Sequence, residues 1–133
     1  MDKRTLKFLA IFGFAAVAFC GIADAGSKTL NETVLIYGSG LRVHGSLGAV
    51  RNSASPTEYI GCRVSASPSG STVSCTAQDA AGAQFSCSSS NANLVNAALG
   101  ISGDSWVNVI KDSTGTCTFL AVENSSVHEP KAP

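Results

Sequence analysis

The stretch VSCTAQDAAGAQFSC, from Val73 to Cys87, decides how this chain is expected to fold. Two short runs of strand-like composition flank Asp79-Ala80-Ala81-Gly82. The aspartate can bond the turn backbone, and the glycine can take the left-handed conformation that closes a three-residue hairpin loop. A calcium loop would need several converging oxygen ligands, whereas this stretch offers one carboxylate among alanines. The stretch therefore predicts a hairpin in which Cys75 faces Cys87.

Similar turn motifs recur along the chain. Asp112-Ser113-Thr114-Gly115 repeats the pattern, and Ser67-Pro68-Ser69-Gly70 resembles it. Short apolar runs between such turns are typical of strands, and they are expected at 32–38, 41–45, 59–66, 71–78, 83–89, 105–111 and 116–123. Residues 45–58 read as a polar loop and 127–133 as a loose tail. Helical spacing of apolar residues over 91–100 predicts one short helix, which Asn91 or Asn93 can cap and Gly100 can end. The predicted fold class is mainly β, an antiparallel sandwich or small barrel built from hairpins.

The first 25 residues have the pattern of a secretory signal peptide. Three cations, Lys3, Arg4 and Lys7, precede a short apolar run, and Ala23-Asp24-Ala25 forms a small-x-small cleavage site. The apolar run is too short for a membrane-spanning helix, which needs about 20 residues. A lipid-anchored Cys20 is the alternative, but the bulky Phe19 disfavours it. We expect export to the periplasm or the exterior, with no transmembrane segment after cleavage.

Cleavage would leave residues 26–133 as a single domain, since 108 residues suit one core. Six Lys and Arg stand against seven Asp and Glu in this region, which gives a net charge of −1. No basic stripe is present to neutralise phosphates, so nucleic acid is excluded as an expected partner.

Four cysteines remain in the mature region, namely Cys62, Cys75, Cys87 and Cys117. An even number in a short exported chain predicts two disulfides. Structural zinc sites space a ligand pair two to four residues apart, whereas these gaps are 13, 12 and 30 residues. There is no Cys-x-x-Cys redox pair either. We therefore expect no metal and no cofactor.

The pairing of the cysteines follows from hairpin register, and two arguments conflict. In the predicted hairpin Cys75 and Cys87 form a hydrogen-bonded pair, whose side chains lie less close than a disulfide prefers. A two-residue loop at Pro68-Ser69 would give Cys62 and Cys75 the closer arrangement, but proline cannot take the positive φ of the favoured loops. The preferred prediction is Cys62–Cys75 with Cys87–Cys117. The alternative is Cys75–Cys87 with Cys62–Cys117.

Few residues are candidates for chemistry. His44 is expected on the solvent side of a strand and His128 in the tail, without the phosphate-binding cations that a His–His ribonuclease pair would use. No serine lies in the full nucleophile-elbow pattern. Tyr37, Tyr59 and Trp106 are the aromatics that a carbohydrate or peptide site could use, although Trp106 equally suits a core position. No catalytic residue is predicted.

The segment GSLGAVRNSASPTEYIGC (45–62), the two Asp-x-x-Gly hairpins and the closing VENSSVHEPK (122–131) resemble small exported proteins of Gram-negative bacteria whose function is not characterised. The resemblance implies no activity, ligand or site residue. From the residues we expect a secreted or periplasmic, non-enzymatic binding or structural module. Its partner would be a protein or an envelope component, and inhibition of another protein is one form of such binding. The alternative is a small secreted hydrolase that uses His44 with a carboxylate.

Overall fold

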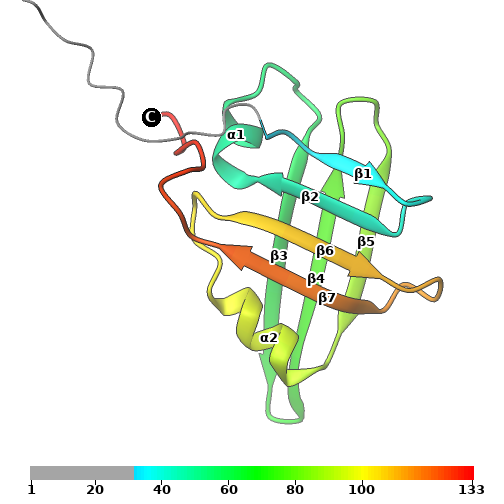
Figure 1. The fold of residues 1–133 in the computed structure, drawn as a ribbon. Helices are drawn as coiled ribbons and strands as arrows, with labels where there is room; N and C mark the ends of the chain where they lie inside the picture. Colours follow the sequence, from blue (N-terminus) through cyan, green and yellow to red (C-terminus); the bar gives the residue numbers. More distant parts are fainter. Residues whose placement is uncertain (1–31) are drawn as a thin grey trace, which may run out of the picture.

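The computed structural model describes residues 32–133, whose seven strands form two antiparallel sheets (Figure 1). The four-stranded sheet has the order β1-β2-β6-β7, with bounds Leu35–Tyr37, Arg42–Ser46, Trp106–Lys111 and Cys117–Glu123. The three-stranded sheet has the order β3-β4-β5, with bounds Tyr59–Ser67, Gly70–Gln78 and Gln84–Ser89. The predicted fold class, mainly β and antiparallel, is confirmed. The predicted signal peptide, 1–25, lies outside the described residues.

The core fills the space between the two sheets, whose strands cross at a steep angle (Figure 1). Alternate residues of a strand point to opposite faces, so one set from each strand faces the other sheet. Val43, Val107 and Val109 are fully buried from the four-stranded sheet, and Val73 and Phe85 from the three-stranded sheet. The architecture is a small β-sandwich.

Two disulfides join the strands. Cys62 and Cys75 lie opposite each other on β3 and β4 with their Cα atoms 4.0 Å apart. Cys87 and Cys117 are bonded with their Cα atoms 5.1 Å apart, which ties β5 to β7 and so joins the two sheets. The preferred pairing is confirmed. Cys75 also faces Cys87, as the hairpin register predicts.

The turn at Pro68 resolves the conflict in the sequence argument. Ser67 pairs with Gly70, so the loop does contain only Pro68 and Ser69. Neither loop residue has a positive φ; the unusual conformation is at Gly70, whose φ is +140°. Glycine takes this conformation without a steric penalty, so the strands close around a proline that keeps its normal φ.

The two Asp-x-x-Gly turns have the predicted geometry. In the first, the Gly82 N–H donates to the Asp79 carbonyl and the Asp79 N–H to the Ala83 carbonyl, both at 3.0 Å. Gly115 and Asp112 repeat the first of these bonds at 3.2 Å. Both glycines have a φ of +86°. The left-handed position is therefore used in both hairpins.

Residues 32–133 contain two short helices where the sequence predicts one. The expected helix is α2, Ala92–Leu99, with the Asn91 side chain accepting from the Asn93 N–H at 2.9 Å. The other, α1, spans Leu47–Asn52 within the segment that was expected to be a loop. That expectation is wrong because Ser46 caps the helix and its short apolar side, Ala49 and Val50, is buried. No helix of residues 32–133 is long and apolar enough to cross a membrane.

The expectation of a loose C-terminal tail also differs from the structure. His128 is buried, with 8% of its surface exposed. The tail beyond it lies against α1, where the buried Gly48 leaves room for the backbone of Glu129 and Pro130. Sequence patterns did not indicate this docking because it depends on contacts between residues about 80 positions apart.

Candidate binding site

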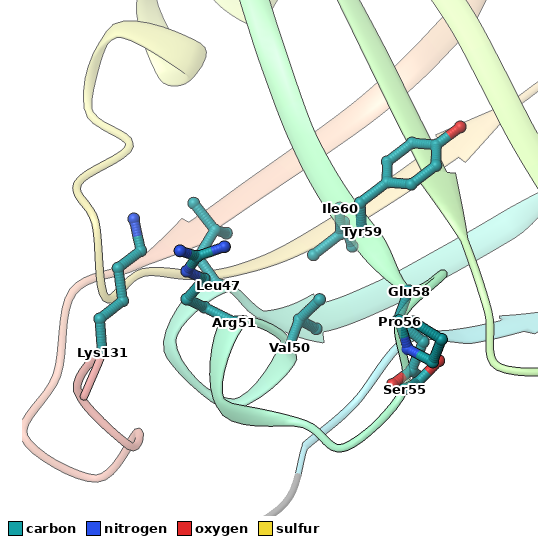
Figure 2. A pocket seen from close by; sticks show the side chains of 9 residues that line it. All are labelled: Leu47, Val50, Arg51, Ser55, Pro56, Glu58, Tyr59, Ile60 and Lys131. Carbon is teal, nitrogen blue, oxygen red and sulfur yellow. The ribbon is translucent and has the colours of Figure 1, made fainter. Parts of the chain in front are cut away.

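An open pocket of about 390 Å³ lies between α1 and the start of β3 (Figure 2). We call it the α1–β3 pocket. Nine residues line it, all labelled in Figure 2. Its volume lies within the range of about 300–1,000 Å³ that is usual for small-ligand sites. Two further pockets, of about 240 and 280 Å³, are lined mostly by serine and threonine.

Helix α1 supplies the apolar side of the pocket and one of its cations. Leu47 and Val50 lie one turn apart and face the pocket together with Ile60 of β3. Arg51, in the last turn of α1, is exposed and also lines it. The result is an apolar surface with a guanidinium at its margin.

The C-terminal tail contributes the second cation, Lys131. The Lys131 backbone N–H donates to Asp104 Oδ1 at 3.0 Å, and its side chain lies over Gly103. Figure 2 places Lys131 and Arg51 toward one side of the pocket and Glu58 toward the other. Neither cation forms an ion pair with a carboxylate among the described residues. That side of the pocket therefore carries two cations without a direct ion pair, and the Asp104 carboxylate lies against the backbone of Lys131.

The tail is held in place by the side chain of Asn52, the residue after Arg51. The Asn52 amide donates to Glu129 Oε1 and to the Pro130 carbonyl, both at 2.9 Å. Its Oδ1 accepts from the Ala132 N–H at 2.8 Å. These bonds fix the backbone on both sides of Lys131.

A second group of side chains lies on the outer face of the four-stranded sheet. The rings of Tyr37, His44, Trp106 and His128 follow one another at centroid distances of 5.4, 5.7 and 6.1 Å. Trp106 and His128 are stacked, with 10° between their planes. The rings therefore pack on one another, and none of the three pockets includes any of them. Trp106 is neither in the central core nor free to stack on a ligand.

The carboxylates near this row contact His128 rather than His44. His128 Nδ1 lies 2.7 Å from Glu32 Oε2, and Nε2 lies 3.3 Å from Glu123 Oε1 without hydrogen-bond geometry. The His128 side chain is 5% exposed. Within residues 32–133 the His44 side chain has no hydrogen bond or ion pair, being flanked by Tyr37 and Trp106.

The aromatic and histidine residues that the sequence offers as candidates are thus divided between the outer face of the four-stranded sheet and the α1–β3 pocket. Tyr37, His44, Trp106 and His128 are brought together on the outer sheet face, while Tyr59 lines the α1–β3 pocket. Sequence reasoning did not single out Arg51 or Lys131 as site residues, because they are 80 positions apart and α1 was not expected. No group of three His, Cys, Asp or Glu side chains in the described part of the chain is placed to hold a metal ion.

Comparisons with protein-family models, with curated proteins and with solved structures find no match. The resemblance drawn from the sequence stays a prediction.

Proposed function

We propose that the protein is an exported, non-enzymatic binding module whose α1–β3 pocket takes an anionic group attached to an apolar body. The observation that carries the proposal is the pairing of two cations, Arg51 and Lys131, with the apolar side chains of Leu47, Val50 and Ile60 in one pocket. Ligand sites typically combine an apolar lining with a few polar groups that orient the ligand.

The chemistry of the lining favours binding over catalysis. General acid–base catalysis most often uses a histidine, and the pocket lining contains no histidine and a single carboxylate, Glu58. The hydrolase alternative would need a carboxylate beside His44, and the nearby carboxylates contact the buried His128 instead. No observation favours that alternative.

Export to the periplasm or the exterior is part of the proposal. Two disulfides support it, because disulfides form and persist in oxidising compartments. Cations at the pocket margin also suit partners that carry carboxylates, and protein or envelope components both provide these groups.

The proposal is tested by NMR titration of the disulfide-oxidised protein with N-acetyl-L-leucine and with N-acetyl-L-leucinamide. The two ligands have the same apolar body, and only the first has a carboxylate. We expect saturable shifts at Arg51, Tyr59 and Ile60 with the acid, and affinity about tenfold weaker with the amide, equivalent to about 1.4 kcal/mol. Arg51→Met combined with Lys131→Met should remove this difference.

Arg42→Met is the matched control. Arg42 is an exposed arginine on β2, and it does not line the pocket. Its substitution should leave the preference for the acid unchanged. Equal affinity for acid and amide in the parent protein, or shifts that avoid the pocket, would refute the proposal.

A further inference from the structure

Among residues 32–133, strand β3 is an edge strand whose outer edge is unpaired. Within this part of the chain it pairs only with β4, because the sheet order is β3-β4-β5. In an antiparallel pair the opposed residues alternate between hydrogen-bonded positions and closer, non-hydrogen-bonded positions. The Cα separation of 4.0 Å places Cys62 and Cys75 at a non-hydrogen-bonded position. The residues of β3 that direct their backbone groups away from β4 are therefore Ile60, Cys62, Val64 and Ala66.

These four residues present four N–H and four C=O groups along one line. None of the hydrogen bonds among residues 32–133 outside the strand ladders uses any of them. Such a row is a template for the addition of a further strand. The other edges of the described sheets are shorter or interrupted. β1 has three residues, β7 is paired through a register shift at Ile110/Lys111, and β5 is bridged at Ser88 to Thr116.

β3 lacks most of the features that normally prevent a further strand from pairing with a sheet edge. Edge strands are commonly blocked by proline, by lysine, by a bulge or by being short. β3 has nine residues, contains no proline or lysine, and pairs with β4 without a register shift. Its one charged side chain is Arg63, which is exposed. The edge is thus long and regular, and its outward backbone groups have no hydrogen-bond partner in the described part of the chain.

The α1–β3 pocket lies at the beginning of this edge. Tyr59 and Ile60 both line the pocket, and consecutive residues of a strand point to opposite faces of the sheet. Figure 2 shows the two side chains diverging from β3 in this way, with the Tyr59 ring directed away from Leu47, Val50 and Arg51. The pocket therefore adjoins the edge at Ile60, the first residue that directs its backbone groups outward. The row of backbone groups from Ile60 to Ala66 therefore begins at the pocket.

The cations of the pocket determine which way an added strand would run. A strand antiparallel to β3 would start beside Ala66 and end at the pocket, so that its carboxyl terminus reaches Arg51 and Lys131. A parallel strand would bring a positively charged amino terminus to the same cations. Like charges repel and opposite charges attract, so the antiparallel direction is favoured.

We propose that the β3 edge and the α1–β3 pocket together bind the extended carboxyl-terminal segment of a partner polypeptide as an additional antiparallel strand. The terminal carboxylate lies between Arg51 and Lys131, and the last side chain covers Leu47, Val50 and Ile60. This inference rests on the proposed function and names its ligand class. Backbone hydrogen bonds along β3 give affinity, and the pocket gives the requirement for a free terminus.

The test uses four fluorescein-labelled heptapeptides, GSTVTTX, in which the last residue X is leucine, isoleucine, valine or phenylalanine. Each is made with a free carboxylate and as the amide, and binding to the oxidised protein is measured by fluorescence polarisation. We expect at least one carboxylate peptide to bind about tenfold more tightly than N-acetyl-L-leucine, and its amide to bind about tenfold more weakly than the peptide acid. Arg51→Met with Lys131→Met should weaken the acid to the level of the amide, whereas Arg42→Met should not.

Backbone pairing is tested on the same peptide by N-methylation. One version is methylated at the odd-numbered residues and the other at the even-numbered residues. Only one of these sets directs its N–H groups toward β3, so one version should lose at least tenfold in affinity and the other should bind like the parent. Val64→Pro removes one outward N–H of β3 without removing a bond to β4, and it should weaken the peptide but not N-acetyl-L-leucine. Circular dichroism checks that this variant is folded.

The outcomes separate the two proposals. If N-acetyl-L-leucine binds in the pocket but no heptapeptide binds more tightly, or if both N-methylated versions bind like the parent, strand addition is wrong while the pocket proposal stands. If neither the small acid nor any peptide binds, both are wrong. Equal binding of peptide acid and amide overturns the inferred direction. Sedimentation that shows a dimer in the parent and a monomer in Val64→Pro would mean that a second copy occupies the edge, which also overturns the inference.

Discussion

Replacement of Gly48 by alanine tests whether the C-terminal tail is a fixed part of the domain. Gly48 is a buried residue of α1. A β-carbon added there would lie 2.9 Å from the carbonyl carbon of Glu129 and 3.0 Å from that of Pro130, and closer still to the Glu129 carbonyl oxygen. These atoms belong to the backbone of the tail, so no side chain can rotate away. The tail would have to leave α1.

The expected change in the free energy of unfolding is the balance of two effects. Alanine in place of glycine stabilises a helix interior by up to about 1 kcal/mol. Displacement of the tail removes the three hydrogen bonds of Asn52, each with a net contribution of about 0.5–1.5 kcal/mol. Repacking around His128 adds to this loss. We expect Gly48→Ala to be destabilised by about 1–2 kcal/mol.

The measurement is urea unfolding of the oxidised protein, with the Asn52 side-chain amide followed by NMR. Gly61→Ala is the matched control, because a β-carbon at Gly61 meets nothing within 4 Å. It should be as stable as the parent or slightly more stable. If Gly48→Ala is at least as stable as the parent and the Asn52 amide resonances do not move, the docking of the tail is wrong.

Four further predictions concern the rest of the domain. Replacing Cys87 and Cys117 by alanine should lower stability more than replacing Cys62 and Cys75, because the first disulfide closes a loop of 30 residues and the second a loop of 13. The chain-entropy model assigns these loops about 3.5 and 3 kcal/mol. Equal urea midpoints for the two double variants would contradict this prediction. Gly82→Val and Gly115→Val should each cost about 1–3 kcal/mol of unfolding free energy, against little for Ala81→Val, because only the glycines have a φ of +86°. Hydrogen bonds from the Thr114 hydroxyl and then from the Thr116 N–H hold the pKa of Asp112 below its ordinary value. The stability that this carboxylate contributes is therefore present above the unfolded pKa of about 3.9 and is lost as pH falls through the folded pKa. Asp112→Asn should reduce this loss of stability at acid pH, and an NMR titration of Asp112 that gives an ordinary or raised pKa would refute the prediction. A screen on RNA, peptidoglycan, ester and peptide substrates should give no turnover in the parent or in His44→Ala, and activity lost in that variant would promote the hydrolase alternative.

The strands were predictable because each carries its own signal. Alternation, short apolar runs and Asp-x-x-Gly turns are local features, and Gly82 and Gly115 have the conformation that the turns require. The cysteine pairing was predicted only in part, since register brought Cys62 to Cys75 but the proline in the loop argued against it. Proline is tolerated in this loop because the residue with the positive φ is Gly70, outside the two loop residues.

Helix α1 and the tail could not be predicted, because each depends on the other. Six residues that include a glycine have little helical tendency alone, and α1 is held by the Ser46 cap and by burial of Ala49 and Val50. Gly48 has no helical advantage, but it is the residue that lets the tail approach. The pocket was missed for the same reason: Arg51 and Lys131 line one pocket only after both segments have docked.

The same docking explains why a small domain can present two cations at one pocket at little cost. Arg51 is placed by α1, and the backbone of Lys131 is held by Asp104. The bonds of Asn52 to Pro130 and Ala132 fix the neighbours of Lys131 on both sides. His128, which precedes these neighbours in the chain, is buried between Glu32 and Glu123. The tail is therefore anchored before it reaches α1. A ligand therefore has to order only the two side chains, and not the tail, when it binds. Because ordering flexible groups opposes association, two cations on a fixed backbone retain more of their attraction for a carboxylate than the same residues on a free terminus would.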